Sequence, residues 1–335
     1  ICSNSFSLKI KSKIKNEIME GDLICKKNHI FKIHLGIPRF VINKQIDFVK
    51  TKNAFSVKWK KFHKSYHDKK WIKLQKKWFL DRFGWNNILE FEKFLFSKKN
   101  ILEAGTGVGN TAFLLSLNKK SQIFAIDVSD SIEFAYKKYG TIQNIHFIQS
   151  DIQQMPFKKK FFNFILSDQV LHHTNNTQKS FKILTKYLQK KGVISIYIYN
   201  KKGPIREFTD DYIRETSTKM TEKECMELSE QLAYLGKNLA KIKTKIQIPK
   251  NIPLLNIKAG TYDIQRFVYW NFIKCWWSKD VPFKQSIATN FDWYFPKFAF
   301  RHTSKEIKKW FNISKIKITY LKEIESGICI SGINE

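Results

Sequence analysis

Three glycines stand at alternate positions in residues 101–110, ILEAGTGVGN, directly behind an apolar run and an acid. A Walker-type phosphate loop needs Lys followed by Ser or Thr right after its last glycine, but here Asn and Thr follow Gly109. The dinucleotide fingerprint G-x-G-x-x-G is not matched either. The Glu103 carboxylate, two residues ahead of Gly105, would repel a pyrophosphate and attract an ammonium or sulfonium group. The loop therefore favours a ligand with a positive charge and no phosphate.

Two further acids follow apolar, strand-like runs. Asp127 ends the run QIFAIDV, where a carboxylate can accept both hydroxyls of a ribose. Asp151 follows the next run, in QSDIQQMPF, where capping a helix is the alternative role. Together with Glu103 and the glycine turn, these acids predict a site for a nucleoside that has a cationic tail and lacks phosphates.

The elements that must position these acids begin near residue 100. From there, short apolar strands alternate with helical stretches, which predicts a parallel sheet with crossover helices. We therefore expect an α/β fold: a Rossmann-like, seven-stranded sheet with helices on both faces, a small N-terminal β-rich segment, and a helical insert before the last helix. The predicted units are 1–42 (β-rich), 43–99 (helical, covering the active site), 100–200 (Rossmann-like core), 201–299 (helical substrate cap) and 300–335 (completion of the core).

Four motifs in this region occur in order: LEAGTGVGN, AIDVS, SDIQQMPF and FNFILSDQVLHHT. In sequence and spacing they resemble the class I S-adenosylmethionine-dependent methyltransferases, over about 100–200 and again over 303–333. The resemblance implies the same seven-stranded fold and S-adenosylmethionine as the cofactor.

The resemblance also assigns roles to individual residues. Gly105 and Gly107 would let the backbone approach the cofactor, and Glu103 would support its amino-acid end. Asp127 would take the ribose hydroxyls, while Asp151 and the amide that follows it would contact the adenine. The complete set of predicted cofactor-binding residues is Glu103, Gly105, Thr106, Gly107, Gly109, Asp127, Val128, Asp151, Ile152 and Asp168.

Methyl transfer is an in-line displacement, so the acceptor atom must be held about 3 Å from the methyl carbon, and a base can remove its proton. His172 and His173 follow the fourth strand of the predicted sheet, at the rim of the crevice. His172 resembles the basic histidine of some oxygen methyltransferases. The alternative is a histidine that only packs at this rim. The segment FDWYFPKFAFRHT, residues 291–303, should return over the strand ends as an acceptor pocket, or else only close the insert. The predicted catalytic residues are His172, Asp292, Tyr294 and Arg301.

The N-terminal segment ends in GIPRF, and DWY-x-P and RHT occur near residue 300. This combination resembles a bacterial subset of these methyltransferases with an N-terminal zinc-ribbon-like segment, many of which look like tailoring enzymes of saccharide or secondary-metabolite pathways. Cys2, Cys25 and His29 are the candidate zinc ligands, although Asn28 stands where a ribbon cysteine is usual. The chain begins with Ile, so we expect its true start to be missing.

The composition is strongly basic, with 60 Lys and Arg against 29 Asp and Glu and a net charge of +31. Such a charge fits nucleic acid or an anionic membrane, but the lysines are spread along the chain, which favours a solvated basic surface. No apolar run approaches the roughly 18 residues of a membrane helix, and five irregularly spaced cysteines favour reduced thiols. We expect a soluble, cytoplasmic protein.

Three functions follow from these observations. The first is methyl transfer to oxygen or nitrogen of a small-molecule acceptor. The second is an RNA methyltransferase, which requires a basic stripe beside the pocket and salt-sensitive binding. The third is a partner protein that binds S-adenosylmethionine without catalysis.

Overall fold

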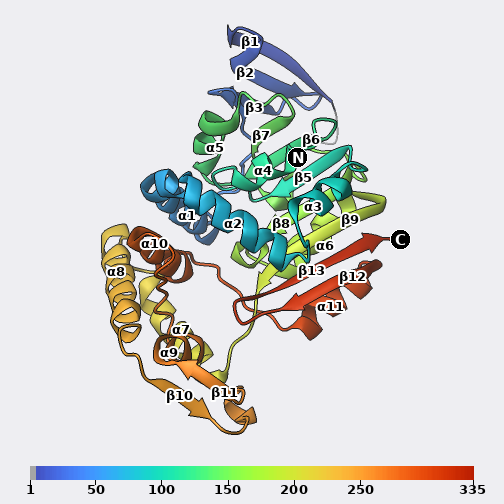
Figure 1. Ribbon diagram of the computed structural model, residues 1–335. Coiled ribbons are helices and arrows are strands. Elements are labelled where there is room, and N and C mark those ends of the chain that lie inside the picture. Colours follow the sequence, from blue (N-terminus) through green and yellow to red (C-terminus); the bar gives the residue numbers. More distant parts are fainter. Residues whose placement is uncertain (1–4) are drawn as a thin grey trace.

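A seven-stranded sheet forms the centre of the computed structural model, which describes residues 5–335 (Figure 1). Along the sheet the strand order is β12-β13-β9-β8-β5-β6-β7. Strands β5 to β9 run parallel, and β13 is antiparallel to both β9 and β12. This arrangement confirms the predicted α/β fold. The strands are β5 (Asn100–Ala104), β6 (Gln122–Asp127), β7 (Ile145–Gln149), β8 (Phe162–Asp168), β9 (Leu188–Tyr199), β12 (Ile316–Glu323) and β13 (Gly327–Asn334).

Both faces of the sheet are covered, as the continuous apolar strands require. Ile101 packs into one buried cluster and Leu102 into another, because consecutive side chains of a strand point to opposite faces. Helices α3, α4 and α5 contribute to the first cluster, and α6 and α11 to the second. These helices are α3 (Ile88–Leu95), α4 (Asn110–Leu115), α5 (Ser131–Tyr139), α6 (Thr177–Tyr187) and α11 (Ser304–Ile313), with short 3₁₀ helices η1 (Ile152–Gln154) and η2 (Leu171–His173).

The N-terminal segment forms a separate antiparallel sheet in the order β1-β2-β3-β4. The residues directly after the last strand of this sheet contact the edge of the central sheet. The Phe40 amide donates to the carbonyl of Gln149 (2.7 Å), and the Arg39 guanidinium donates to the Gln149 side chain (3.0 Å). The exposed edge of β7 is thereby partly covered. The strands are β1 (Phe6–Ile14), β2 (Glu17–Cys25), β3 (Ile30–His34) and β4 (Ile37–Pro38).

Two helices, α1 (Ile46–Tyr66) and α2 (Lys69–Arg82), connect this segment to the core. Helix α1 contacts both α5 of the core and α10 (Phe283–Tyr294) of the insert, so it bridges the two. On α2, Trp71 is buried in a cluster with Phe62 and Tyr66, whereas Trp78 is 37% exposed.

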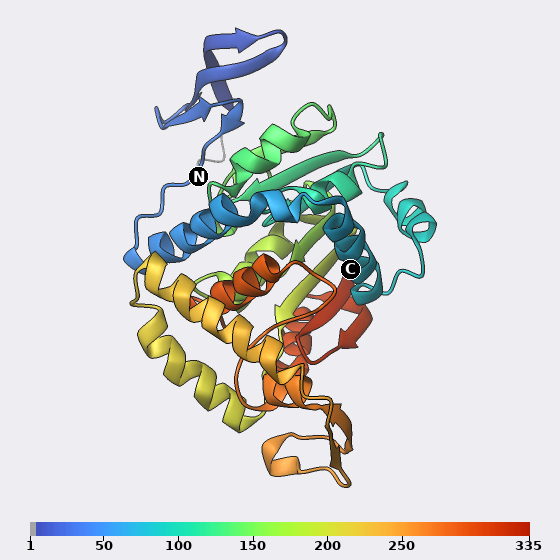
Figure 2. The same ribbon diagram turned by 60° about the vertical axis from the view of Figure 1, so that its left-hand side comes forward.

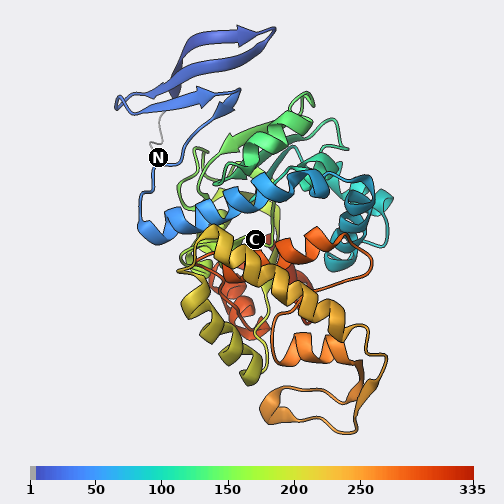
Figure 3. The same cartoon turned by 90° about the vertical axis from the view of Figure 1, so that its left-hand side faces the viewer.

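The insert between β9 and α11 is mostly helical, as predicted, and its helix α8 begins with a capping box of Thr221 and Glu224. It also contains an antiparallel hairpin, which the prediction of a helical insert did not include. Figures 2 and 3 show this hairpin and the N-terminal sheet at opposite ends of the molecule. The elements are α7 (Pro204–Ser217), α8 (Glu222–Leu239), β10 (Lys245–Ile248), η3 (Pro253–Leu255), β11 (Gly260–Asp263), α9 (Ile264–Asn271) and α10 (Phe283–Tyr294).

Within residues 5–335, none of the helices combines the length and apolarity needed to cross a bilayer. The four cysteines of the same part of the chain, Cys25, Cys225, Cys275 and Cys329, are buried and free.

Candidate functional site

A cavity of about 710 Å³ lies between the carboxyl ends of the parallel strands, helices α1 and α2, and the insert. Its size is within the range of small-molecule sites. The predicted site residues that line it are Glu103, Gly105, Thr106, Gly107, Asp127, Val128, Asp151, Ile152, Asp168 and Asp292. Four of the predicted cofactor-binding and catalytic residues are not among its walls: Gly109, His172, Tyr294 and Arg301.

The glycine loop owes its shape to left-handed backbone conformations. Gly105, Gly107 and Gly109 have φ angles of 95°, 56° and 86°, which side chains rarely tolerate. A Cβ at Gly105 would lie 2.2 Å from a methyl carbon of Val170, and one at Gly107 would lie 3.1 Å from the Trp59 ring. The loop therefore presents bare backbone to the cavity. Gly109 has a different position, because it is the N-cap of α4.

Glu103 lies at the end of β5 and is only 4% exposed. One of its carboxyl oxygens accepts a hydrogen bond of 2.6 Å from the Thr106 hydroxyl. Burial, reinforced by the negative charges of Asp168 and Asp127, raises the pKa of Glu103 to about 8. A buried carboxyl group of this kind gains most from a cationic ligand, because the ligand's charge would compensate the ionised form.

Asp127 lies at the end of β6, opposite the loop. The Gly107 amide donates to its Oδ2 (2.8 Å), and the Ser129 amide and hydroxyl donate to its Oδ1 (2.9 and 2.6 Å). Burial raises the pKa of Asp127 while these donors lower it. Each oxygen retains lone-pair capacity toward the cavity, so the side chain is held in place and still able to accept hydroxyl donors.

Asp151 and Asp168 each have a partner within the chain. Asp151 accepts a hydrogen bond of 2.9 Å from the Gln153 amide and so caps η1, which is its alternative role, while also lining the cavity. Asp168 pairs with the Arg82 guanidinium at 2.7 Å, and its Oδ1 is buried without a partner within residues 5–335. Arg82 was not predicted from the sequence.

The two histidines of LHH occupy different environments. His172 is completely buried, its ring stacks on Tyr199 at 3.6 Å between centroids, and its Nδ1 accepts from the Tyr199 amide. This corrects the expectation that His172 lies at the rim of the crevice. His173 lines the cavity instead, and its Nδ1 donates to the Phe298 carbonyl (2.7 Å), which leaves Nε2 as the acceptor nitrogen. Burial lowers the pKa of His173 to about 4.

Asp292 on α10 lines the cavity and forms an ion pair of 2.5 Å with the buried Lys58 on α1. Burial opposes the charge on Lys58, but Asp292 and Tyr66 outweigh it and raise the Lys58 pKa. Lys58 was not predicted from the sequence, because it is one of many lysines in α1 and only the packing shows that it is buried.

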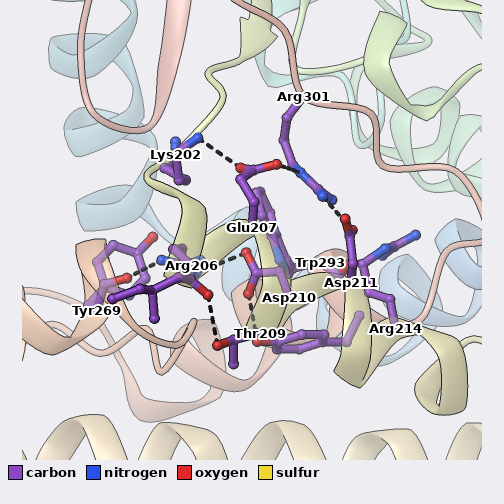
Figure 4. A network of polar contacts seen from close by, with 12 residues as sticks. Lys202, Arg206, Glu207, Thr209, Asp210, Asp211, Arg214, Tyr269, Trp293 and Arg301 are labelled. Atoms are coloured by element: carbon purple, nitrogen blue, oxygen red, sulfur yellow. Dashed lines mark hydrogen bonds and ion pairs between the residues drawn. The ribbon is translucent and has the colours of Figure 1, made fainter. Parts of the chain in front are cut away.

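Tyr294 and Arg301 hold the insert together and do not form its pocket, which corrects their predicted catalytic placement. The Tyr294 hydroxyl donates to Asp210 (3.1 Å), which also pairs with Arg206 (2.9 Å). The Arg301 guanidinium binds Glu207 (2.8 Å) and Asp211 at the outer side of the same network, as Figure 4 shows. Their polar atoms are directed to α7 and away from the cavity because α7 supplies the carboxylates.

The predicted zinc ligands are only partly within the described residues. The Cys25 thiol and His29 Nδ1 are 3.4 Å apart, and Cys2 lies outside residues 5–335. In that part of the chain, no three or more potential ligands come together, whereas a structural zinc site needs four. The described residues thus supply two neighbouring ligands, and zinc binding stays a prediction.

Comparison with known proteins agrees with this geometry. A family model described as a methyltransferase domain matches residues 95–259, which span β5 to β9 and the first half of the insert. These residues, just under half of the chain, are therefore similar to a methyltransferase domain, and the seven-stranded sheet has the α/β methyltransferase fold.

Individual relatives are more distant. A ubiquinone/menaquinone biosynthesis C-methyltransferase of Wigglesworthia glossinidia brevipalpis is 28% identical over 130 residues, 37% of this chain and 51% of the relative. A malonyl-[acyl-carrier protein] O-methyltransferase of Legionella pneumophila is 29% identical over 109 residues, 31% of this chain and 38% of the relative. The chain thus spans about half or less of these relatives' lengths.

Among solved structures, magnesium protoporphyrin IX methyltransferase from Synechocystis PCC 6803, with bound SAH, is 12% identical. The match covers 85% of this chain and 98% of that one, with a TM-score of 0.46. A SAM-dependent methyltransferase from Aquifex aeolicus is 13% identical, with coverages of 76% and 92% and a TM-score of 0.40.

Proposed function

We propose that this protein transfers a methyl group from S-adenosylmethionine to oxygen or nitrogen of a small organic acceptor, such as a saccharide or a secondary metabolite. The observation that carries the proposal is the convergence of Glu103, Asp127 and Asp151 with a bare glycine backbone in one cavity. S-adenosylmethionine supplies an electrophilic methyl group on a sulfonium. The residues fit it because the cavity offers carboxyl groups to a cationic tail and to ribose hydroxyls.

The chain's own residues then have separate tasks. Glu103 compensates the ammonium of the amino-acid end, Asp127 accepts the ribose hydroxyls, and Ile152 and Asp151 face the adenine. The acceptor lies on the side of α1 and the insert, against Asp292, and His173 Nε2 accepts the acceptor proton when the nucleophile must lose one. The insert lines one side of the cavity, which favours a small acceptor over a long RNA chain.

The activity is tested with S-adenosylmethionine carrying a labelled methyl group and cell extract split into small-molecule, protein and RNA fractions. Label in the small-molecule fraction is the expected result. Label in RNA would contradict a small-molecule acceptor and support an RNA methyltransferase. Cofactor binding without a labelled product in any fraction would support a non-catalytic partner protein.

The pKa of Glu103 predicts a proton linked to cofactor binding. The raised pKa of about 8 means that the folded protein holds this proton at pH 7, and a cationic ligand should expel it. Cofactor affinity should therefore rise with pH up to about 8 and level off above it. Calorimetry at pH 7 in buffers of different ionisation enthalpy should show about one proton released.

The matched control is Glu103→Gln, which cannot titrate. Proton changes on the ligand itself occur equally in both proteins, so their difference reports Glu103 alone. Equal proton release from wild type and Glu103→Gln would contradict the assignment of this carboxyl group to the cationic end of the cofactor.

The two histidines should respond differently to substitution. His173→Ala should lower kcat by about 100-fold or more if His173 accepts the acceptor proton, with cofactor affinity unchanged. His172→Ala should instead lower the free energy of unfolding, because it removes the stacking on Tyr199. Steady-state kinetics and thermal unfolding on both variants check this; a loss of turnover confined to a stable His172→Ala protein would return the role to His172.

A further inference from the structure

The part of the cavity that the insert forms carries an excess of positive charge. Of the two acids that line it from the insert, Asp292 is neutralised by Lys58, and Asp280 is exposed to solvent. The cationic side chains that line it from the insert and its entry are Lys202, Arg206, Arg266 and Lys274.

Lys274 is the most unusual of these cations. Its side chain is buried, with 5% of the residue exposed, and within residues 5–335 its ammonium group has no hydrogen bond to an acceptor and no ion pair. It lies 4.3 Å above the Trp293 ring and 6.0 Å from the Tyr269 ring. Burial lowers the pKa of Lys274 to about 8, although the nearby negative charges of Asp292 and Asp210 oppose this shift. A buried cation with no carboxylate in direct contact is unfavourable, so this position favours a use other than stability.

Arg206 converges on the same two rings. Its guanidinium carbon is 5.3 Å from the Tyr269 ring and 5.6 Å from the Trp293 ring. Its Nε pairs with Asp210 at 2.9 Å and its Nη1 donates to the Tyr269 carbonyl, as Figure 4 shows. In the described part of the chain Nη2 has no hydrogen-bond acceptor. The guanidinium is thus held in place by Nε and Nη1, and its Nη2 edge remains free to donate to a ligand.

Lys202 contributes positive charge to the cavity, but its ammonium group is already hydrogen-bonded within the chain. Its ammonium donates to the carbonyls of Asn200 (2.8 Å) and Glu325 and lies 5.5 Å from the Trp270 ring. Burial and the neighbouring Arg206 and Lys274 charges lower its pKa to about 7. Because Arg206 and Lys274 also lie over the same two rings, an anion that entered there would reduce the repulsion between these cations.

We propose that the acceptor is a small organic anion whose charged group binds Lys274 and the free edge of Arg206, with its apolar body against the aromatic walls. This inference rests on the proposed function and specifies its substrate class. The aromatic rings of Tyr269, Trp270 and Trp293 supply the apolar surface, and the two cations supply orientation relative to the strand ends, where the methyl group is delivered.

The first test uses the labelling reaction with small molecules that anion exchange has separated into an anionic pool and a neutral or cationic pool. Label should enter the anionic pool, and Lys274→Met should reduce this labelling at least about tenfold while the Kd for S-adenosylmethionine is unchanged. Lys279→Met, which removes an exposed lysine of the same insert, is the matched control and should label normally. Label in the neutral pool or in RNA overturns the anionic acceptor and leaves methyl transfer intact.

A second test does not depend on turnover. Binding of 4-hydroxybenzoate and of its uncharged methyl ester to the full chain is followed by tryptophan fluorescence. The carboxylate should bind at least about tenfold more tightly than the ester, and Lys274→Met should abolish the difference. Equal affinities, or no saturable binding of the carboxylate, overturn the inference. Lys274→Met should also be at least as stable as wild type; marked destabilisation would assign Lys274 a structural role instead.

Discussion

Asp292→Ala is expected to lower the free energy of unfolding by about 3 to 5 kcal/mol, because it strands the buried Lys58 ammonium without its counter-ion. The pair is 2.5 Å long, and its side chains are only 8% and 17% exposed. It joins α1 to α10 and so holds the insert over the strand ends. Activity should be lost together with stability. Chemical denaturation, followed by circular dichroism, measures the change.

The same interface provides a matched control. Lys61 of α1 and Glu222 of α8 form an ion pair of 2.8 Å whose side chains are 42% and 43% exposed, and breaking an exposed pair costs less than about 1 kcal/mol. A second control, Lys58→Met combined with Asp292→Leu, replaces both charges by apolar groups and should recover most of the stability. If Asp292→Ala were no more destabilising than Lys61→Ala, the buried pair would not be what attaches the insert.

Asp127→Ala is expected to weaken S-adenosylmethionine binding by at least about 100-fold, which corresponds to two lost hydrogen bonds to a charged acceptor at about 1.5 kcal/mol each. The reason is that Asp127 is held by Gly107 and Ser129 with its remaining lone pairs available to the cavity. Isothermal titration calorimetry with S-adenosylmethionine and with S-adenosylhomocysteine gives the change for both ligands, which should be similar because they share the ribose.

The neighbouring Asp130 serves as the control, because it is exposed and lies outside the cavity walls. Asp130→Ala should bind both ligands like wild type. Asp127→Asn, which keeps the shape of the side chain, separates loss of the acceptor charge from collapse of the loop. If a folded Asp127→Ala protein bound both ligands as tightly as wild type, the assignment of Asp127 to the ribose hydroxyls would be wrong.

Local sequence patterns were sufficient for the central sheet. The strand ILEA is buried along its apolar length and its two neighbours follow the same rule, so the sheet and the positions of its carboxyl ends could be predicted. The hairpin at β10 and β11 was missed because both strands are short and none of their side chains is fully buried. The alternation in β10 covers only four residues, and β11 is mostly exposed.

The adjacent histidines show that local sequence patterns do not predict the direction of a side chain. His172 and His173 are equivalent in sequence, but the 3₁₀ turn directs one ring onto Tyr199 and the other into the cavity. Likewise the segment DWYFPKFAF contains several polar groups that could form a pocket. In the structure Tyr294 contacts Asp210 of α7, and Asp292 contacts Lys58 of α1. These partners from other helices set the directions of the two side chains.

The sequence by itself determined that acids and a glycine turn meet at one edge of a parallel sheet, because the ends of successive parallel strands lie side by side wherever such a sheet forms. Only the tertiary structure decided which cations of a lysine-rich chain are buried and which side chains face the acceptor. Lys58 and Asp292 are 234 positions apart, and a contact over that distance depends on how the insert packs on α1, which no local periodicity encodes.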